Sequence, residues 1–529
     1  MQTTKKKSPF QHICLLSLAV LLASCSLGVG RPSSDSSSTN EEETASSSEI
    51  SLTEDSSSSE SIPSEEPSSY EGEAKTFRFY CVNDFHGSIV PTGYEVGLSS
   101  LFSFLKSKVD EDPDHTIVLS AGDMFQGSWE SNSNRGHLIV DAMGAVPFSA
   151  MTLGNHDFDY GIDALQSLID SAKFPTLAGN INYYGTETRW EHSLPSAMIE
   201  KDGVKIGIIG NIGQGQTTSI QARIVQDLDF VDPLPVIEKE AIALKNQGAQ
   251  IVVNVLHDQA TVMNTTAMNI SLKDFIDGSF GGHNHQKEYQ TYDGVPVVNG
   301  GYNGRGYSYF ELTISEDGVV PSNAAAIAAP EDFPEDPAIR TIIDRYLDDD
   351  FNAKTNEVLG TLTGGTIDNS AVARLGCKAI YEEYKSKYPD LVVTMENSQR
   401  APLYSGEITY GKLYKATPFM NSIVFAKATG REIKAEASHN STYTGDRETY
   451  ATLNDGEMYT IGVIDYLYFH QDRHKNCNYF PSAANEENIL GIENDFPVDI
   501  TARYIKNRLG GTLISSSVSG TANGFDLYK

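Results

Sequence analysis

Gly154-Asn155-His156-Asp157-Phe158-Asp159-Tyr160-Gly161 follows an apolar run, 148–153, that has the composition of a buried strand. The stretch brings an amide, an imidazole and two carboxylates to the carboxyl end of that strand. Ligands of open α/β sheets bind outside the carboxyl ends of the strands. The stretch therefore predicts a functional site, although a single His beside an Asp is more often a surface arrangement.

Other strand-like runs of the first half end in the same way. The sequence predicts strands at 77–82, 116–120, 148–153, 204–210, 251–256, 295–298 and 310–314, with helices at 98–109, 137–143 and 162–169. Four of these strand ends and the stretch Gly281-Gly282-His283-Asn284-His285 offer the polar side chains Asp84, His86, Asp123, Asn155, His156, His257, His283 and His285. Asp84 and His86 are two positions apart, so both point to one side in an extended backbone.

These side chains indicate a metal centre. Imidazole, carboxylate and amide groups without a thiolate suit a borderline divalent cation, and their number exceeds what one four-coordinate ion needs. We therefore expect two divalent metal ions that share a carboxylate. The metals could be Zn, Mn, Fe or Co, because the same ligands suit all four.

The beginning of the chain predicts export. Residues 1–25 combine a basic start, Lys5-Lys6-Lys7, with a short apolar run from Ile13 to Ala23. Leu22-Ala23-Ser24-Cys25 then resembles the lipobox of bacterial lipoproteins, which implies lipidation of Cys25. We expect a signal peptide and an extracytoplasmic protein that is lipid-anchored to the bacterial cell membrane; the alternative is an uncleaved membrane helix.

Residues 26–74 are rich in Ser and Glu and almost free of apolar side chains. Such a segment cannot bury enough surface to offset the entropy of ordering, so it predicts a disordered, extended tether. The tether supplies part of the net charge of −32. This charge argues against a nucleic-acid polymer as a partner.

Few cysteines remain after the signal segment, namely Cys81, Cys377 and Cys477. An odd and widely spaced trio is not a disulfide framework, and no pair has the spacing of a zinc site. We expect Cys81 to be a buried thiol, and at most one bridge, between Cys377 and Cys477, stays open.

The second half begins after a composition change near Pro321. Apolar residues at helical spacing predict a linker helix within 331–356, and a second domain is expected over 357–529. Its predicted elements are a helix at 371–388, a strand at 391–394 and a loop at 395–403. The metal-bearing part is accordingly expected to span 75–330.

The ordered motifs of the first half resemble the 5'-nucleotidase family of two-domain dinuclear metallophosphatases. They are Asn83-Asp84-Phe85-His86-Gly87, Gly122-Asp123, Gly154-Asn155-His156-Asp157-Phe158-Asp159, His257 and Gly282-His283-Asn284-His285. The resemblance implies an α/β fold: an N-terminal two-sheet metallophosphatase domain, an α/β/β/α sandwich, and a C-terminal α+β substrate-binding domain. It implies Asp84, His86 and His285 as ligands of one ion, Asn155, His257 and His283 as ligands of the other, Asp123 as the bridging carboxylate, and His156 with Asp159 as the catalytic pair.

The second half also resembles the family in the order of its motifs. Arg400-Ala401-Pro402-Leu403, the stretch from Gly406 to Tyr414 and Pro418-Phe419-Met420-Asn421 correspond to an Arg-bearing loop, a helix and a Pro-Phe turn. The resemblance implies that Phe419 and Tyr466 stack on a nucleobase, that Arg400 binds a phosphate or ribose and that Asp472 is the family's acid. The alternative for each aromatic side chain is ordinary core packing.

This half departs from the family at several positions. Met395-Glu396-Asn397-Ser398-Gln399 replaces the usual glycine-rich run, so Glu396 is expected to add a negative charge near an anion site. Tyr468-Phe469-His470-Gln471 replaces a second glycine-rich loop, and an arginine that the family places before the helix is missing around Asp368. The sequence therefore predicts the reaction, phosphoester hydrolysis, more firmly than it predicts the substrate.

We expect hydrolysis of a small-molecule nucleotide, a 5'-nucleoside monophosphate, to nucleoside and phosphate. The first alternative is the same chemistry on 2',3'-cyclic nucleotides, nucleotide sugars or non-nucleotide phosphoesters. The second is a non-catalytic surface binding lipoprotein, which the complete set of metal and catalytic residues disfavours.

Overall fold

The computed structural model describes residues 70–263, 272–438, 442–444, 452–469 and 480–518. Two six-stranded sheets form the centre of the first half. The first sheet contains β1 Lys75–Val82, β2 Thr116–Ser120, β3 Ala150–Thr152, β4 Thr176–Leu177, β13 Gly306–Ser315 and β14 Gly318–Ala328, in the order β14-β13-β1-β2-β3-β4. The second contains β6 Ser196–Lys201, β7 Val204–Ile212, β9 Ile251–His257, β10 Gly278–Gly281, β11 Lys287–Tyr292 and β12 Val295–Gly300, in the order β11-β12-β10-β9-β7-β6.

The side chains of β1 alternate between the two faces of its sheet, and this alternation explains why the two sheets pack face to face. Phe77, Phe79 and Cys81 point into the core between the sheets, whereas Tyr80 and Val82 join the core beneath the helices. Across the same core, the Phe280 ring of the second sheet stacks on the Phe310 ring of the first, with centroids 4.3 Å apart.

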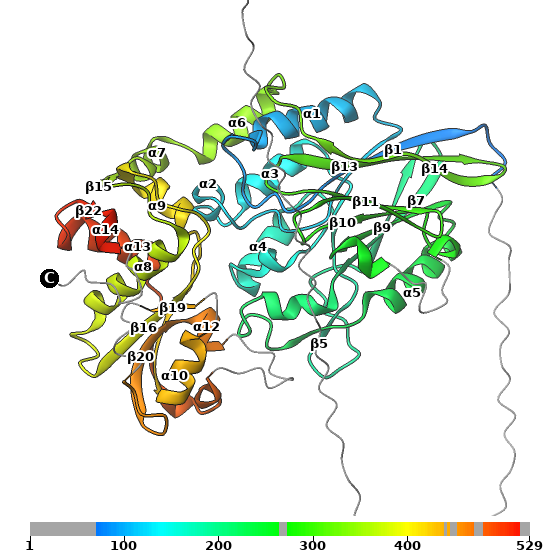
Figure 1. Cartoon of the computed structure of the whole chain (residues 1–529). Coiled ribbons are helices and arrows are strands. Elements are labelled where there is room, and N and C mark those ends of the chain that lie inside the picture. The colour runs from blue at the N-terminus through cyan, green and yellow to red at the C-terminus, as the bar shows by residue number, and fades with distance from the viewer. Residues whose placement is uncertain (1–69, 264–271, 439–441, 445–451, 470–479, 519–529) are drawn as a thin grey trace, which may run out of the picture. The chain divides into compact units, whose positions relative to one another are not determined.

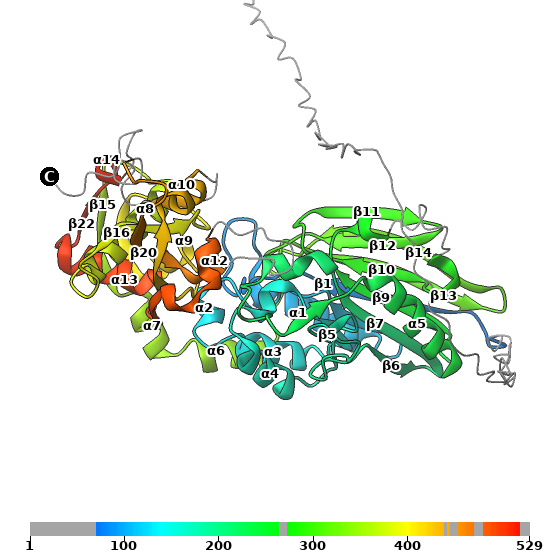
Figure 2. The same cartoon turned by 90° about the horizontal axis from the view of Figure 1, so that it is seen from below.

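Helices cover the outer faces of both sheets. On the first sheet they are α1 Gly97–Glu111, α3 His137–Ala145, α4 Ile162–Ser171 and α6 Pro337–Tyr346, and on the second α5 Pro233–Asn246. Figure 1 shows α1 beyond β1 and β13 and α5 on the opposite side, beside β7 and β9. Figure 2 shows α5 beside β7 and β9 again. The predicted α/β/β/α sandwich is confirmed.

The parallel strands bring the predicted site residues to one edge of each sheet. β1, β2 and β3 run parallel, and so do β7, β9 and β10. Their carboxyl ends therefore lie side by side, which is where the polar residues follow them in the sequence. The predicted strand at 116–120 coincides with β2.

The second half is α+β. A three-stranded sheet has the order β17-β15-β22 and a five-stranded mixed sheet the order β19-β16-β20-β18-β21. Their strands are β15 Val358–Thr363, β16 Leu391–Asn397, β17 Gly406–Thr409, β18 Ile423–Thr429, β19 Thr442–Thr444, β20 Met458–Ile464, β21 Ile489–Glu493 and β22 Thr512–Ile514. The main helices are α8 Asn369–Tyr384, α9 Tyr410–Ala416, α10 Gly430–Ala437, α12 Asp465–Phe469 and α13 Pro497–Arg503. Both halves belong to one compact unit, Glu65–Lys529.

Several predicted boundaries were wrong. Met395 and Glu396, expected in a loop, continue β16 because they pair with Thr444 and Tyr443 of the neighbouring strand. The helix α8 ends at Tyr384 rather than 388.

The connection between the two halves is not the single linker helix that the sequence predicts. Two helices follow one another, α6 and α7 Asp349–Thr355, and Asp348 begins the second by accepting a hydrogen bond from Phe351 N at 2.9 Å. The strand β14 was not predicted. It lies at the edge of the sheet, where a proline such as Pro321 is tolerated because the outer side of the strand has no neighbouring strand to bond.

Cys81 is a buried thiol, as predicted. Cys377 is buried too, but Cys477 lies outside the described residues, so a bridge between them stays a prediction. The signal segment with Cys25 and nearly all of the tether also lie outside them. Among the helices that the structure describes, none combines the length and the apolar character needed to cross a membrane.

Candidate active site

Seven metal ligands were predicted, of which Asn155 is the only amide. The structure gathers the other six, which are carboxylates and imidazoles, into two groups. One group holds Asp84, His86 and His285, and the other holds Asp123, His257 and His283, with the ligand atoms of each group within 4.8 Å of one another. In the first group, His86 Nε2 lies 3.0 Å from His285 Nε2, and His285 Nε2 lies 3.4 Å from Asp84 Oδ1. Two ligands that each lie about 2.1 Å from one cation have such separations.

Asp123 lies between the two groups. Its Oδ2 atom is 3.4 Å from His257 Nε2 and 3.9 Å from His86 Nε2, so one carboxylate faces a histidine of each group. Asn155 belongs to the second group, since its Oδ1 atom lies 3.1 Å from His257 Nε2 and 3.0 Å from His283 Nδ1. This arrangement fits two divalent cations with Asp123 between them, and the assignment of each ligand stays a prediction.

Backbone carbonyl groups orient the buried histidines. Ala121 O accepts from His257 Nδ1 at 2.7 Å and Gln126 O from His86 Nδ1 at 3.0 Å. Each contact fixes the tautomer and turns Nε2 toward the centre. Burial lowers the pKa of His86 to about 3, which keeps its imidazole neutral and its lone pair available to a cation.

The backbone around the centre is held in an uncommon conformation. The residues with left-handed backbone include five of the predicted ligands: Asp84, His86, Asp123, His283 and His285. Side chains other than glycine rarely adopt positive φ, and each instance costs on the order of 1–2 kcal/mol. Gly154 permits a close approach, because a Cβ atom there would collide with the Asp123 carboxylate. The surrounding fold thus enforces the directions of the ligands.

Asp157 holds this loop together, a role that the sequence did not reveal. Its carboxylate accepts from Gly154 N at 2.8 Å, Asp123 N at 2.9 Å and Met124 N at 3.0 Å. It is fully buried and contacts the backbone of Asp123 rather than the two ligand groups. The only signal in the sequence was an extra acid between His156 and Asp159.

We expect Asp157→Ala to weaken metal binding about 10–100-fold, because four backbone donors, the fourth being Phe125 N, lose their acceptor and Asp123 loses its position. Metal titration of stripped protein measures the effect. Asp163→Asn, an exposed carboxylate at the start of α4, is the matched control. Unchanged metal affinity in Asp157→Ala would show that the loop keeps its shape without this carboxylate.

His156 stands beside the centre with its predicted partner. Its Nδ1 atom lies 2.8 Å from Asp159 Oδ2, its backbone N donates to Asp123 Oδ1 at 2.7 Å, and its ring centroid is 5.3 Å from that of His86. Loss of solvation lowers the pKa of His156, but the carboxylates of Asp159 and Asp123 more than offset this and raise it to about 9. His156 is therefore protonated at neutral pH and can donate a proton.

Replacement of Asp159 is expected to move the alkaline limb of the pH–kcat profile downward by about one to two units. A general acid must be protonated, so activity falls as the pH rises through its pKa. Asp159→Asn removes the charge that raises this pKa toward 9. Bound cations lower the absolute value in both proteins, so the comparison between wild type and Asp159→Asn is the measurement. An unshifted alkaline limb would exclude His156 as the group that titrates.

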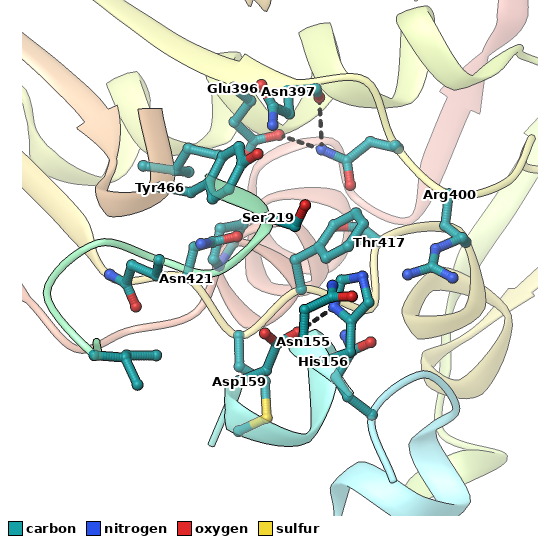
Figure 3. A pocket seen from close by; sticks show the side chains of 18 of the residues that line it. Asn155, His156, Asp159, Ser219, Glu396, Asn397, Arg400, Thr417, Asn421 and Tyr466 are labelled. Carbon is teal, nitrogen blue, oxygen red and sulfur yellow. Dashed lines mark hydrogen bonds and ion pairs between the residues drawn. The ribbon is translucent and has the colours of Figure 1, made fainter. Parts of the chain in front are cut away.

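A pocket of about 370 Å³ opens beside this centre and is lined from both halves of the chain. It contains Asn155, His156, Asp159 and His283 from the first half and Arg400, Phe419 and Tyr466 from the second. Figure 3 shows His156 and Asp159 at one end of this pocket, with Arg400 and Thr417 facing the same space. Asp472, the remaining predicted substrate residue, lies outside the described residues.

The second half positions its pocket residues through several contacts. The Arg400 guanidinium lies 5.3 Å from the centroid of the Phe419 ring. Asp465 accepts from Asn421 Nδ2 at 2.8 Å and from Tyr466 N at 2.7 Å, which orients both residues. The sequence did not predict Asn421 or the first-half residues Thr218, Ser219 and Gln221, which also line the pocket. Thr218 and Ser219 lie in the short 3₁₀ helix Gln214–Ser219, and Gln221 and Asn421 lie outside regular elements. None of these segments shows a periodic sequence pattern.

Comparisons with known proteins agree with this geometry. Residues 77–287 match the family model of calcineurin-like phosphoesterases, and residues 352–468 match that of the C-terminal domain of 5'-nucleotidases. The human 5'-nucleotidase is 24% identical over 412 residues, which are 70% of either chain. An apyrase of Tabanus yao is 29% identical over 214 residues, 39% of this chain and 38% of the apyrase, so the match spans well under half of that relative.

A solved structure supports the fold. The crystal structure of a 5'-nucleotidase precursor from Thermus thermophilus has a TM-score of 0.65 at 18% identity and covers 84% of this chain and 100% of its own. The two matched models, in the order that the sequence motifs imply, account for both halves of the described fold. The chain is therefore a member of the two-domain 5'-nucleotidase family of calcineurin-like, metal-dependent phosphoesterases.

Proposed function

We propose that the protein hydrolyses 5'-nucleoside monophosphates to nucleoside and phosphate. One observation carries the proposal: a single pocket places Asn155, His283 and His156 together with Arg400, Phe419 and Tyr466, and His283 belongs to one of the two ligand groups. One end of the pocket thus suits a phosphoryl group, while the aromatic residues suit a planar base. Stacking of a base on an aromatic ring contributes about 1–3 kcal/mol.

Two divalent cations at this centre would activate a water molecule and neutralise the charge of the phosphoryl oxygens. Asp84, His86 and His285 would hold one cation, and Asn155, His257 and His283 the other, with Asp123 between them. His156 donates a proton to the alkoxide that leaves, and Asp159 keeps its imidazolium charged and in position. Arg400 can bind a phosphate or ribose oxygen with its planar guanidinium group.

The experiment is phosphate release from a panel of substrates, with defined metals added back to stripped protein. We expect two ions per chain, chelator-sensitive turnover and a KM for AMP well below that for a simple aryl phosphate. Equal kcat and KM for AMP and the aryl phosphate would exclude the nucleotide specificity but keep the phosphoesterase. A single buried ion without turnover would favour a binding protein over an enzyme.

The proposal includes an extracytoplasmic site of action, with a lipid on Cys25 as the anchor. Its support is the order of a basic start, a short apolar run and small residues before a cysteine. Fractionation of cells that express the full chain tests it. We expect the wild type in the membrane fraction and Cys25→Ala outside it, and equal partition of the two proteins would contradict lipid anchoring.

A further inference from the structure

Three oxygen atoms of the pocket lack a hydrogen-bond partner within the described part of the chain. They are Glu396 Oε1, Asn397 Oδ1 and Gln399 Oε1, and all three residues line the pocket. Glu396 is 1% exposed and Gln399 6% exposed, so water does not freely satisfy them. A buried acceptor without a donor costs about 1–3 kcal/mol, which favours a ligand that supplies the missing donors.

The neighbouring residues fix the Glu396 carboxyl group and leave one oxygen available. Gln399 Nε2 donates to Glu396 Oε2 at 2.9 Å and to the Asn397 carbonyl oxygen at 3.1 Å. Gly376 of α8 makes room for the carboxyl group, because a Cβ atom there would collide with it. Burial without sufficient donors raises the pKa of Glu396 to about 8, so the carboxyl group is mostly uncharged at neutral pH in the absence of ligand.

Glu396 lies far from the metal centre. Figure 3 shows Glu396 and Asn397 at the end of the pocket opposite Asn155, His156 and Asp159. The expectation that Glu396 adds a negative charge near an anion site stays a prediction. A nucleotide whose phosphoryl group lies at His156 extends its base toward this opposite end, which we call the acceptor end: Glu396, Asn397 and Gln399.

We propose that the acceptor end reads the Watson–Crick edge of guanine, so that GMP is the preferred substrate. The inference rests on the proposed nucleotide hydrolysis. Guanine presents two adjacent N–H donors, N1–H and the 2-amino group, and the unpartnered oxygens Glu396 Oε1, Asn397 Oδ1 and Gln399 Oε1 can accept them. Adenine and cytosine offer one amino group beside a ring acceptor, and uracil offers one imino group between two carbonyls. Among these bases, only guanine has two neighbouring N–H donors that match the neighbouring acceptor oxygens of the pocket.

IMP supplies the decisive comparison, because it differs from GMP only by the missing 2-amino group. In the wild type we expect kcat/KM for GMP to exceed that for IMP by roughly tenfold or more, mainly through KM, since IMP leaves a buried acceptor unpaired. In Glu396→Gln the ratio is expected to fall to about one, because the amide turns a donor toward an N–H of the base.

Two further variants accompany the test. Glu432→Gln is the matched control: Glu432 is another buried glutamate, but its oxygens already accept from Thr429 and Ser482. It should keep the GMP to IMP ratio. Gly376→Ala pushes the Glu396 carboxyl group away without changing its charge and should lower the ratio as well. This second variant carries the test if Glu396→Gln fails to fold.

The outcomes separate the two proposals. A wild-type ratio near one, or a high ratio that survives both Glu396→Gln and Gly376→Ala, overturns guanine recognition while preference for AMP over an aryl phosphate still supports nucleotide hydrolysis. If no nucleotide is preferred over the aryl phosphate, the proposed function itself fails and this inference with it. A ratio that falls in both variants and stays high in Glu432→Gln supports it.

Discussion

Asp123→Asn is expected to lose both metal ions and to lower phosphate release by roughly 10³-fold or more. The substitution keeps the size of the side chain and an oxygen that can accept from His156 N, but it removes the negative charge between the two ligand groups. Repulsion between two cations then has no central counter-charge. Metal analysis of the purified variant, combined with turnover at saturating metal, measures both effects.

The control for Asp123→Asn is Asp163→Asn, which removes one exposed carboxylate from the same half. It should retain two ions and full turnover. If Asp123→Asn bound two ions with wild-type affinity, the carboxylate would not bridge them, and the two groups would act as independent sites.

His156→Ala is expected to keep both metal ions but to lower kcat about 10²–10⁴-fold. The imidazole pairs with Asp159 and belongs to neither ligand group, although its ring lies beside that of His86, so its loss removes a proton donor and not a ligand. The effect should be smaller on aryl phosphates with acidic leaving groups, because these need little protonation to depart. Metal content and single-turnover rates on AMP and on an activated aryl phosphate measure the difference.

A fall in metal content parallel to the fall in activity would identify His156 as a ligand. An equal loss of rate on both substrates would exclude proton donation to the leaving group. Either result would require a different role for the contact between His156 and Asp159.

Much of the first half was predictable because its signals are local. The alternation of Phe77, Phe79 and Cys81 with outward residues defines β1, and polar residues directly after buried runs mark the carboxyl ends of parallel strands. The convergence of Asp84 and His86 with Asp123 follows from that topology. His257 and His283 come from the second sheet, so they approach Asp84, His86 and Asp123 only if the two sheets face each other. The family resemblance implied this arrangement, whereas the strand patterns alone did not.

The remaining features depend on contacts that no periodicity records. Asp157 resembles its neighbours in the sequence, and only its four backbone contacts distinguish it from a residue at the centre. Glu396 was expected in a loop because glycine-rich runs precede the arginine in the family, yet strand pairing with Tyr443 and the space left by Gly376 bury it. Ser219 reaches the pocket from the end of a short 3₁₀ helix, Gln214–Ser219, which no sequence period marks.

The lining of one pocket by both halves has a consequence for how this protein can diversify. The bond-breaking apparatus draws on strand ends of the first half, whose backbone tolerates few replacements, whereas the acceptor end draws on β16 and the segment after it. Substitutions there can retune which ester is selected without disturbing hydrolysis. Chains with the same metal-binding loops could thus hydrolyse different phosphoesters.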